Sequence, residues 1–109
     1  MTAFAFQQLD IYRLAMELAV DVHKMTIRDA EIRDQATRAA KSCFLNIAEG
    51  LPSYQSGVRR RHFSIARGSL GELAAAIDLG QALGLVEEAE LTNDKIQRVA
   101  QLLNGFRHL

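Results

Sequence analysis

The chain has 109 residues, of which 49% are hydrophobic, and its 13 basic and 13 acidic residues give a formal net charge of zero. This length suits a single domain, residues 1–109, with a core small enough to gain from self-association. No stretch approaches the roughly 18 apolar residues of a membrane span, and residues 1–8 lack a charged start and a cleavable apolar segment. We therefore expect a cytoplasmic protein with no membrane partner.

The only cysteine, Cys43, excludes an intrachain disulfide and a metal cluster built from thiolates of one chain. Its expected role is that of a small buried hydrophobe. A single proline, Pro52, and the scarcity of alternating apolar and polar residues indicate an all-α chain.

The first two helices are expected over about residues 9–25 and 29–49. In the first, an apolar face recurs at intervals of three and four residues, at Ile11, Leu14, Ala15, Leu18, Val22 and Met25. In the second, the same spacing links Ile32, Ala36, Ala39, Cys43 and Ile47. Gly50 followed by Pro52 supplies a stop.

The third helix is expected after a turn at residues 52–57 and runs to about Leu83, with Gly84 ending it. The fourth starts near Leu91 and Thr92 and continues to the C-terminus. The apolar faces are formed by Phe63, Ala66, Leu70, Leu73, Ile77 and Gly80 in the third helix and Ile96, Val99, Leu102, Leu103 and Phe106 in the fourth. Short connections predict an antiparallel, up-down-up-down four-helix bundle.

Two segments carry polar residues within these helical patterns. They are Arg38-Ala39-Ala40-x-Ser42 with Asn46-Ile47-Ala48-Glu49-Gly50, and Phe63-x-x-Ala66-x-Gly68-Ser69-x-x-Glu72. Together with the weaker patterns Phe6-x-x-Leu9-x-x-Tyr12-x-x-Ala15 and Leu83-Gly84, they cover nearly the whole chain. In these motifs the chain resembles a four-helix-bundle family that includes proteins encoded by intervening sequences of large-subunit ribosomal RNA genes and the accessory variability determinants of diversity-generating retroelements.

The resemblance implies an antiparallel bundle that assembles into a homopentamer. It also implies nucleic-acid binding and a reverse transcriptase partner for the retroelement branch, while many members have no assigned activity. The chain departs from the family pattern at residues 26–29, where an aromatic-proline pair is usual, and at Gly71 within the third helix. A glycine there costs about 1 kcal/mol of helix stability relative to alanine.

The polar residues of the motifs predict a buried network. Burying a polar group without a partner costs about 2–7 kcal/mol, so partners are expected within the chain. Spacings of three and four residues place one set on a single face of the second helix and a pair on the third. The expected members are Arg38, Ser42, Asn46, Glu49, Ser69 and Glu72. Arg38 is expected to donate to Glu49 or Glu72, and Asn46 to bridge the two helices.

The alternative for the same carboxylates is a metal site of the di-iron type. That site needs a histidine three residues after a glutamate, and neither Glu49 nor Glu72 has one. The histidines His23, His62 and His108 are not at ligand spacing, and no serine lies in a catalytic pattern. We expect no metal, no cofactor and no enzymatic activity.

Charge is unevenly distributed along the chain. Residues 33–67 hold seven basic and two acidic residues, a net charge of +5, whereas residues 68–94 hold six acidic residues and no basic one, a net charge of −6. In an antiparallel bundle the loop between the second and third helices and the loop between the third and fourth lie at opposite ends. The sequence therefore predicts a polarised molecule.

Two functions compete on this basis. The first is RNA or DNA binding, in which phosphates contact Lys41, Arg59, Arg60, Arg61 and Arg67. The second is a protein scaffold without nucleic acid, in which charged patches and the apolar residues Phe4, Phe6, Tyr12 and Leu45 meet neighbouring subunits or another protein. A neutral net charge and few aromatic residues weigh against a dedicated nucleic-acid binder, and a run of three arginines can be no more than a solvated helix start.

Overall fold

The computed structural model describes residues 4–106, which form four α-helices preceded by a short 3-10 helix, η1 (Ala5–Gln8). The helices are α1 (Asp10–Lys24), α2 (Ala30–Gly50), α3 (Ser56–Ala82) and α4 (Glu90–Asn104). The prediction of an all-α four-helix bundle is confirmed. Each helix begins and ends within two residues of its expected position, except that α4 ends at Asn104. The fourth helix was expected to continue to the C-terminus, and residues 107–109 of that expected helix lie outside the described residues.

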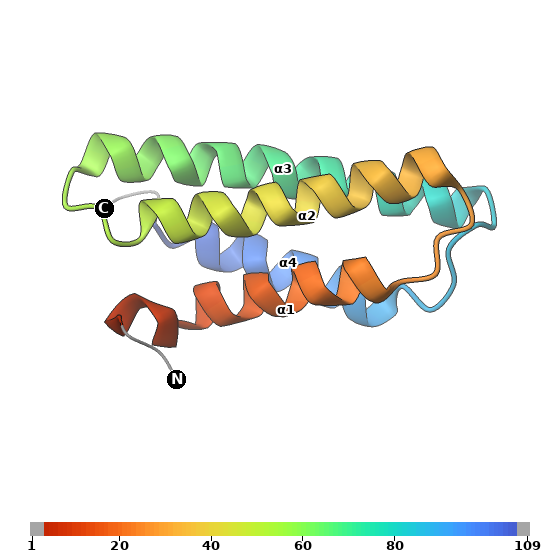
Figure 1. Cartoon of the computed structure of the whole chain (residues 1–109), viewed down its shortest axis with the longest axis horizontal. Coiled ribbons are helices and arrows are strands. Elements are labelled where there is room, and N and C mark those ends of the chain that lie inside the picture. The colour runs from red at the N-terminus through yellow and green to blue at the C-terminus, as the bar shows by residue number, and fades with distance from the viewer. Residues whose placement is uncertain (1–3, 107–109) are drawn as a thin grey trace.

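Consecutive helices run in opposite directions along the longest axis of the molecule, which measures 44 Å (Figure 1). The α2–α3 turn lies at one end, beside η1 and the last turn of α4, and we call this the α2–α3 end. The loops that join α1 to α2 and α3 to α4 lie at the other, which we call the α3–α4 end (Figure 1). Among the described residues no helix is long and apolar enough to cross a membrane.

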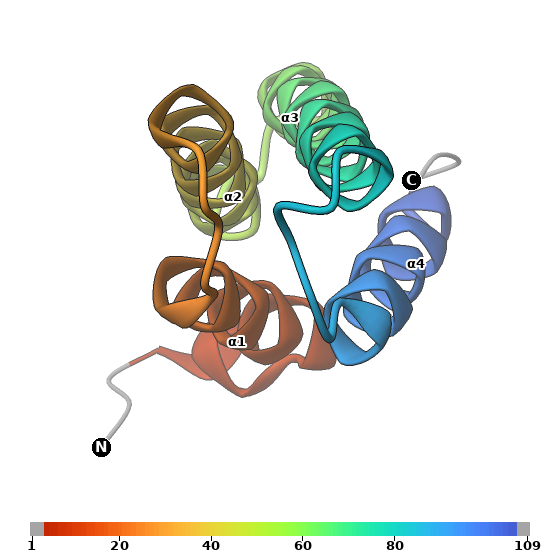
Figure 2. The same cartoon turned by 90° about the vertical axis from the view of Figure 1, so that its right-hand side faces the viewer.

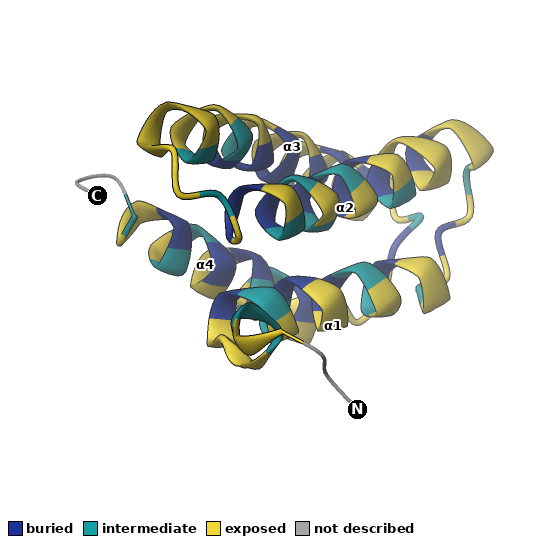
Figure 3. Ribbon diagram, turned by 60° about the vertical axis from the view of Figure 1, so that its left-hand side comes forward, coloured by how far each residue is buried: buried dark blue, intermediate teal, exposed yellow. Residues whose placement is uncertain are grey.

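The four helices are arranged around a common centre (Figure 2), and their buried apolar residues form one core cluster. The buried positions of the helices face this centre (Figure 3). The largest fully buried side chains are Phe63, Leu18, Ile47, Leu73, Ile77 and Leu103. Contact between α2 and α3 is the most extensive, and contact between α3 and α4 is the least extensive of the neighbouring pairs. Leu14 and Met25, expected on the inward face of α1, are only half-buried.

The α1–α2 connection is fixed by polar contacts and one buried side chain. Asp29 caps α2, accepting a hydrogen bond from the Ile32 N–H at 2.9 Å, as acidic N-caps do. Ile27 is buried and forms an isolated bridge with Val86 of the α3–α4 loop, and the Arg28 guanidinium donates to the Gly84 carbonyl. Residues 26–29, where the chain departs from the family pattern, thus tie the two loops of the α3–α4 end together.

Two glycines are required by the packing. An ideal Cβ built on Gly50 would lie 2.8 Å from Phe63 Cε1, and one built on Gly80 would lie 2.5 Å from Val86 Cγ2. Gly84 has φ +72°, a left-handed conformation that ends α3 as expected. By contrast, a Cβ on Gly71 would meet nothing within 4 Å, so no close approach among residues 4–106 explains this glycine.

Two titratable groups are shifted by their surroundings. Burial raises the pKa of the Cys43 thiol to about 12, which keeps it protonated and unreactive at neutral pH. The hydrogen bond from Lys95 of α4 to Asp21 of α1 raises the pKa of Lys95. Because the folded-state pKa is the higher one, this contribution to stability is present at neutral pH and is lost only as pH rises through the folded-state pKa of Lys95.

Candidate nucleic-acid interface and polar network

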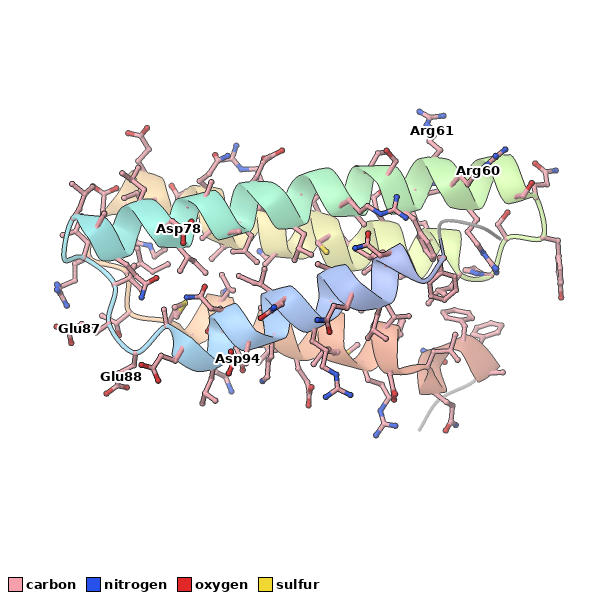
Figure 4. All side chains as sticks on the ribbon, turned by 180° about the vertical axis from the view of Figure 1, so that it is seen from behind. Arg60, Arg61, Asp78, Glu87, Glu88 and Asp94 are labelled. Atoms are coloured by element: carbon pink, nitrogen blue, oxygen red, sulfur yellow. The ribbon has the colours of Figure 1, made fainter. Side chains whose placement is uncertain are left out.

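The arginine run lies in the first two turns of α3, at the α2–α3 end of the molecule. Figure 4 shows Arg60 and Arg61 at this end, with Glu87 and Glu88 at the opposite one. Although the three arginines are consecutive, successive helix positions are about 100° apart around the axis. Their side chains therefore have different surroundings and different roles.

Arg59 has a structural role. Its Nε donates to the Gly50 carbonyl at 3.2 Å, and its Nη2 donates to the Leu51 carbonyl. These are carbonyls at the C-terminus of α2 that lack helical partners, and a cationic side chain is favourable there. Arg59 thus closes the α2–α3 turn and is only partly available to a phosphate.

Arg67 is also engaged within the fold. Its Nη2 donates to the Leu103 carbonyl at 3.0 Å and so links α3 to the end of α4, the neighbouring helices with the least contact. Its Nε is buried and has no hydrogen-bond partner among the described residues. Part of the Arg67 side chain, including Nε, is therefore buried in the seam between α3 and α4.

The other three expected basic residues have no polar partner among residues 4–106. Arg60, Arg61 and Lys41 are exposed, and none makes a hydrogen bond or ion pair with another described residue. Arg38, one helical turn before Lys41 on α2, is likewise exposed and unpaired within residues 4–106. The structure thus divides the expected patch into two engaged arginines and three available side chains.

The opposite end is acidic, though less uniformly than the chain segments suggest. Glu87, Glu88 and Glu90 lie in or beside the α3–α4 loop, while Asp78 and Asp94 lie in the adjoining turns of α3 and α4 (Figure 4). Arg28 forms an ion pair with Glu87 at 3.7 Å. Arg33 also lies at this end, in the first turn of α2. The molecule is polarised, with two arginines among the carboxylates.

The polar motif residues form a chain of hydrogen bonds between α2 and α3. The hydroxyl oxygens of Ser42 and Ser69 are 2.8 Å apart. Asn46 Nδ2 donates to the Ser42 carbonyl at 2.9 Å, and Asn46 Oδ1 lies 3.0 Å from His62 Nδ1. His62 Nδ1 also lies 3.4 Å from Glu49 Oε2. Ser42, Asn46, Glu49 and Ser69 are thus brought together, and Asn46 bridges the two helices.

Two expected members lie outside this chain. Glu72 accepts a longer bond of 3.4 Å from Gln35 on the exposed surface, and Arg38 contacts neither Glu49 nor Glu72. His62, which was not expected in this network, takes the place expected for Arg38 beside Glu49. In the sequence, the only indication of a role for His62 was its position directly after the arginine run, which does not predict the orientation of its ring.

Replacing Asn46 by alanine is expected to lower the free energy of unfolding by about 1 kcal/mol, because the network loses its link to His62 and the Ser42 hydroxyl keeps only Ser69 as a partner. The matched control is Gln35→Ala, which removes the exposed 3.4 Å bond to Glu72 and is expected to change stability by less than about 0.5 kcal/mol. Urea unfolding followed by circular dichroism measures both. If Asn46→Ala and the wild type had equal free energies of unfolding, the network would not stabilise the fold.

Among the described residues no group of three or more His, Cys, Asp or Glu side chains could hold a metal ion. A groove of about 280 Å³ follows the seam between α3 and α4, lined by small and apolar residues with Arg67 and Asn104 at one end. It is at the small end of the range for ligand pockets, and only Arg67 and Asn104 contribute polar side chains to its lining.

Comparison with known families gives one result that agrees with this geometry. Residues 7–105 match the model of the 23S rRNA-intervening sequence protein family. The chain belongs to this family. The match runs from η1 to the end of α4 and so covers all four helices and the polar network. The family's description names no reaction, and the comparison with curated proteins finds no match.

Proposed function

We propose that this member of the intervening-sequence protein family is a homo-oligomeric adaptor that binds nucleic acid through phosphate contacts at the α2–α3 end. The observation that carries the proposal is the pair of exposed side chains Arg60 and Arg61 at this end, with the exposed Lys41 midway along α2. None of the three is paired with another of residues 4–106. Unpaired cations on a rigid helix can release the counterions condensed on a phosphate backbone, which favours binding at low salt. Arg59 and Arg67 contribute indirectly, because Arg59 fixes the α2–α3 turn and Arg67 links α3 to α4.

Assembly of several copies would strengthen such binding. Two or three cations per chain are few for tight binding, and several copies in one assembly multiply them. Surface for such contacts is available, since Met16 and Val20 are exposed one turn apart on α1, and Leu45 and Ile65 are exposed on α2 and α3. A homopentamer is the state that the family resemblance implies.

Simultaneous replacement of Arg60 and Arg61 by alanine is expected to weaken binding and to reduce its salt dependence. The slope of log affinity against log salt should fall by about 0.7 for each single-strand phosphate contact that is lost. The measurement is fluorescence anisotropy of labelled 20-nucleotide RNA and DNA, single-stranded and duplex, at about 50 and 200 mM salt. Light scattering on the same samples gives the mass of the assembly.

The matched control is Lys24→Ala with Arg33→Ala, which removes two exposed basic residues from the opposite end of the molecule. An equal loss in both double variants would mean that only total charge matters and that no interface exists at the α2–α3 end. Absence of binding by the wild-type oligomer at 50 mM salt would overturn the nucleic-acid function altogether.

The second candidate function is a protein scaffold that binds no nucleic acid. It is favoured by the exposed apolar residues Leu45 and Phe4, which are 55% and 62% exposed, although Phe6 and Tyr12 are half-buried within the fold. A stable oligomer that binds none of the four oligonucleotides is the result expected of this scaffold. A reverse transcriptase is the partner that the retroelement branch of the resemblance suggests.

A further inference from the structure

All seven aromatic residues of the chain gather at the α2–α3 end. They lie around η1, in the first turn of α1, near the end of α2, in the α2–α3 turn, early in α3 and just after α4, and they are Phe4, Phe6, Tyr12, Phe44, Tyr54, Phe63 and Phe106. Residues 13–43 and 64–105 contain none. Because consecutive helices alternate in direction, positions far apart in the sequence converge on one end of the bundle (Figure 1).

Five of these rings are accounted for by packing. Phe63 is buried and meets Phe106 edge to face, with ring centroids 5.0 Å apart. Tyr12 lies between Phe6 and Phe44, at centroid distances of 5.8 and 5.1 Å. Such edge-to-face contacts are a favourable arrangement for aromatic pairs. These rings build the apolar end of the core and its cover.

The other two rings are not needed by the core. Tyr54 is fully exposed, at 103% of its reference area, and lies in the turn only six residues before Arg60. Phe4 is 62% exposed, although it stacks on Phe6 with centroids 5.6 Å apart. Exposed aromatic rings at the same end of a molecule as exposed cations are the combination found where proteins bind single-stranded nucleic acid, since bases stack on rings and phosphates contact the cations.

We infer that the ligand of this end is a single-stranded nucleic acid whose bases stack on Tyr54 and Phe4 while its phosphates contact Arg60 and Arg61. This inference rests on the proposed nucleic-acid function and narrows its ligand class. In a duplex the faces of all bases except those at its ends are occupied by neighbouring bases, so exposed rings have few base faces on which to stack. A single strand presents base faces that any aromatic ring can accept, without sequence preference.

The test compares three labelled 20-mers: an oligouridine, an abasic strand with the same sugar-phosphate backbone, and a blunt duplex. Wild-type protein is expected to bind the oligouridine at least about fivefold more tightly than the abasic strand, the lower end of what one base–aromatic stack contributes. Tyr54→Ala with Phe4→Ala is expected to remove this difference and to leave the salt slope unchanged. Tyr54→Phe keeps a ring and should bind like the wild type.

Tyrosine fluorescence gives a direct readout, because the chain has two tyrosines and no tryptophan. Stacking on a base is expected to quench the emission of Tyr54. Quenching by the oligouridine should persist in Tyr12→Phe, whose ring packs inside the fold, and disappear in Tyr54→Phe even though binding is retained.

The outcomes separate the two proposals. Equal, salt-sensitive binding of all three 20-mers would leave phosphate binding in place and overturn stacking. Absence of binding to any of them would overturn the proposed function and stacking together. If the double aromatic variant instead lowered the mass of the assembly and oligonucleotide binding was unaffected, the exposed rings would belong to a contact between copies, and the stacking inference would be wrong.

Discussion

Phe63→Ala is expected to lower the free energy of unfolding by about 3–5 kcal/mol, the usual cost of removing a fully buried phenylalanine. Its ring is 1% exposed, lies against Gly50 at the end of α2 and meets Phe106 after α4. One side chain of α3 therefore holds the ends of two other helices. For a domain of ordinary stability, about 5–15 kcal/mol, this loss approaches complete unfolding.

Two further variants keep the Phe63 prediction measurable. Phe63→Leu retains most of the volume and is expected to cost less than about 1.5 kcal/mol, so it should remain folded. Phe4→Ala is the matched control, because it makes the same substitution at a 62% exposed site and should change stability by less than about 0.5 kcal/mol. Urea unfolding of all three proteins measures the differences. Similar midpoints for Phe63→Ala and Phe4→Ala would contradict the packing described at the α2–α3 end.

Gly80→Ala is expected to destabilise the protein by about 1–3 kcal/mol, although alanine is the better helix former by about 1 kcal/mol. The added Cβ would lie 2.5 Å from Val86 Cγ2 and 3.6 Å from Ile32 Cγ2. Val86 cannot move freely, since it is buried and bridges to Ile27. Overpacking at this site therefore outweighs the gain in helix propensity.

Gly71→Ala provides the opposite result in the same helix. A Cβ there meets none of the described atoms within 4 Å, so the substitution should stabilise the protein by about 0.5–1 kcal/mol.

A double-mutant cycle with Val86→Ala completes the test of Gly80. Gly80→Ala should cost less in the Val86→Ala background than in the wild type, because the clashing methyl group is gone. Equal costs in both backgrounds would place the strain elsewhere.

The fold could be predicted because helical spacing alone defines which faces are apolar. Ile47 and Phe63 repeat at three and four residues with their neighbours, and both are buried. Spacing cannot distinguish residues whose roles depend on how a loop folds back. Gly71 and Gly80 both interrupt α3, yet only Gly80 has Val86 packed against it, because the α3–α4 loop returns to that point.

In the candidate site, too, helical spacing predicts some positions, whereas others depend on how a loop folds. The Ser42, Asn46 and Ser69 side chains were predicted to meet because their positions are polar within an apolar pattern. Arg59 and Arg60 are adjacent and chemically identical, and no pattern predicts that only Arg59 reaches the last carbonyls of α2. That difference arises from the geometry of the turn at residues 51–55.

The separation of charge between the two ends gives this molecule, whose formal net charge is zero, an electric dipole moment. Its formal charge is zero and its sequence pI is about 6.8, so at a distance it is neither attracted nor repelled by a polyanion. In the field close to one it experiences a torque, and the end that carries Arg60 and Arg61 turns toward the negative charge while Glu87 and Glu88 point away (Figure 4). The protein is thus expected to be oriented before it contacts a phosphate backbone. The isoelectric point of the chain does not predict this orientation.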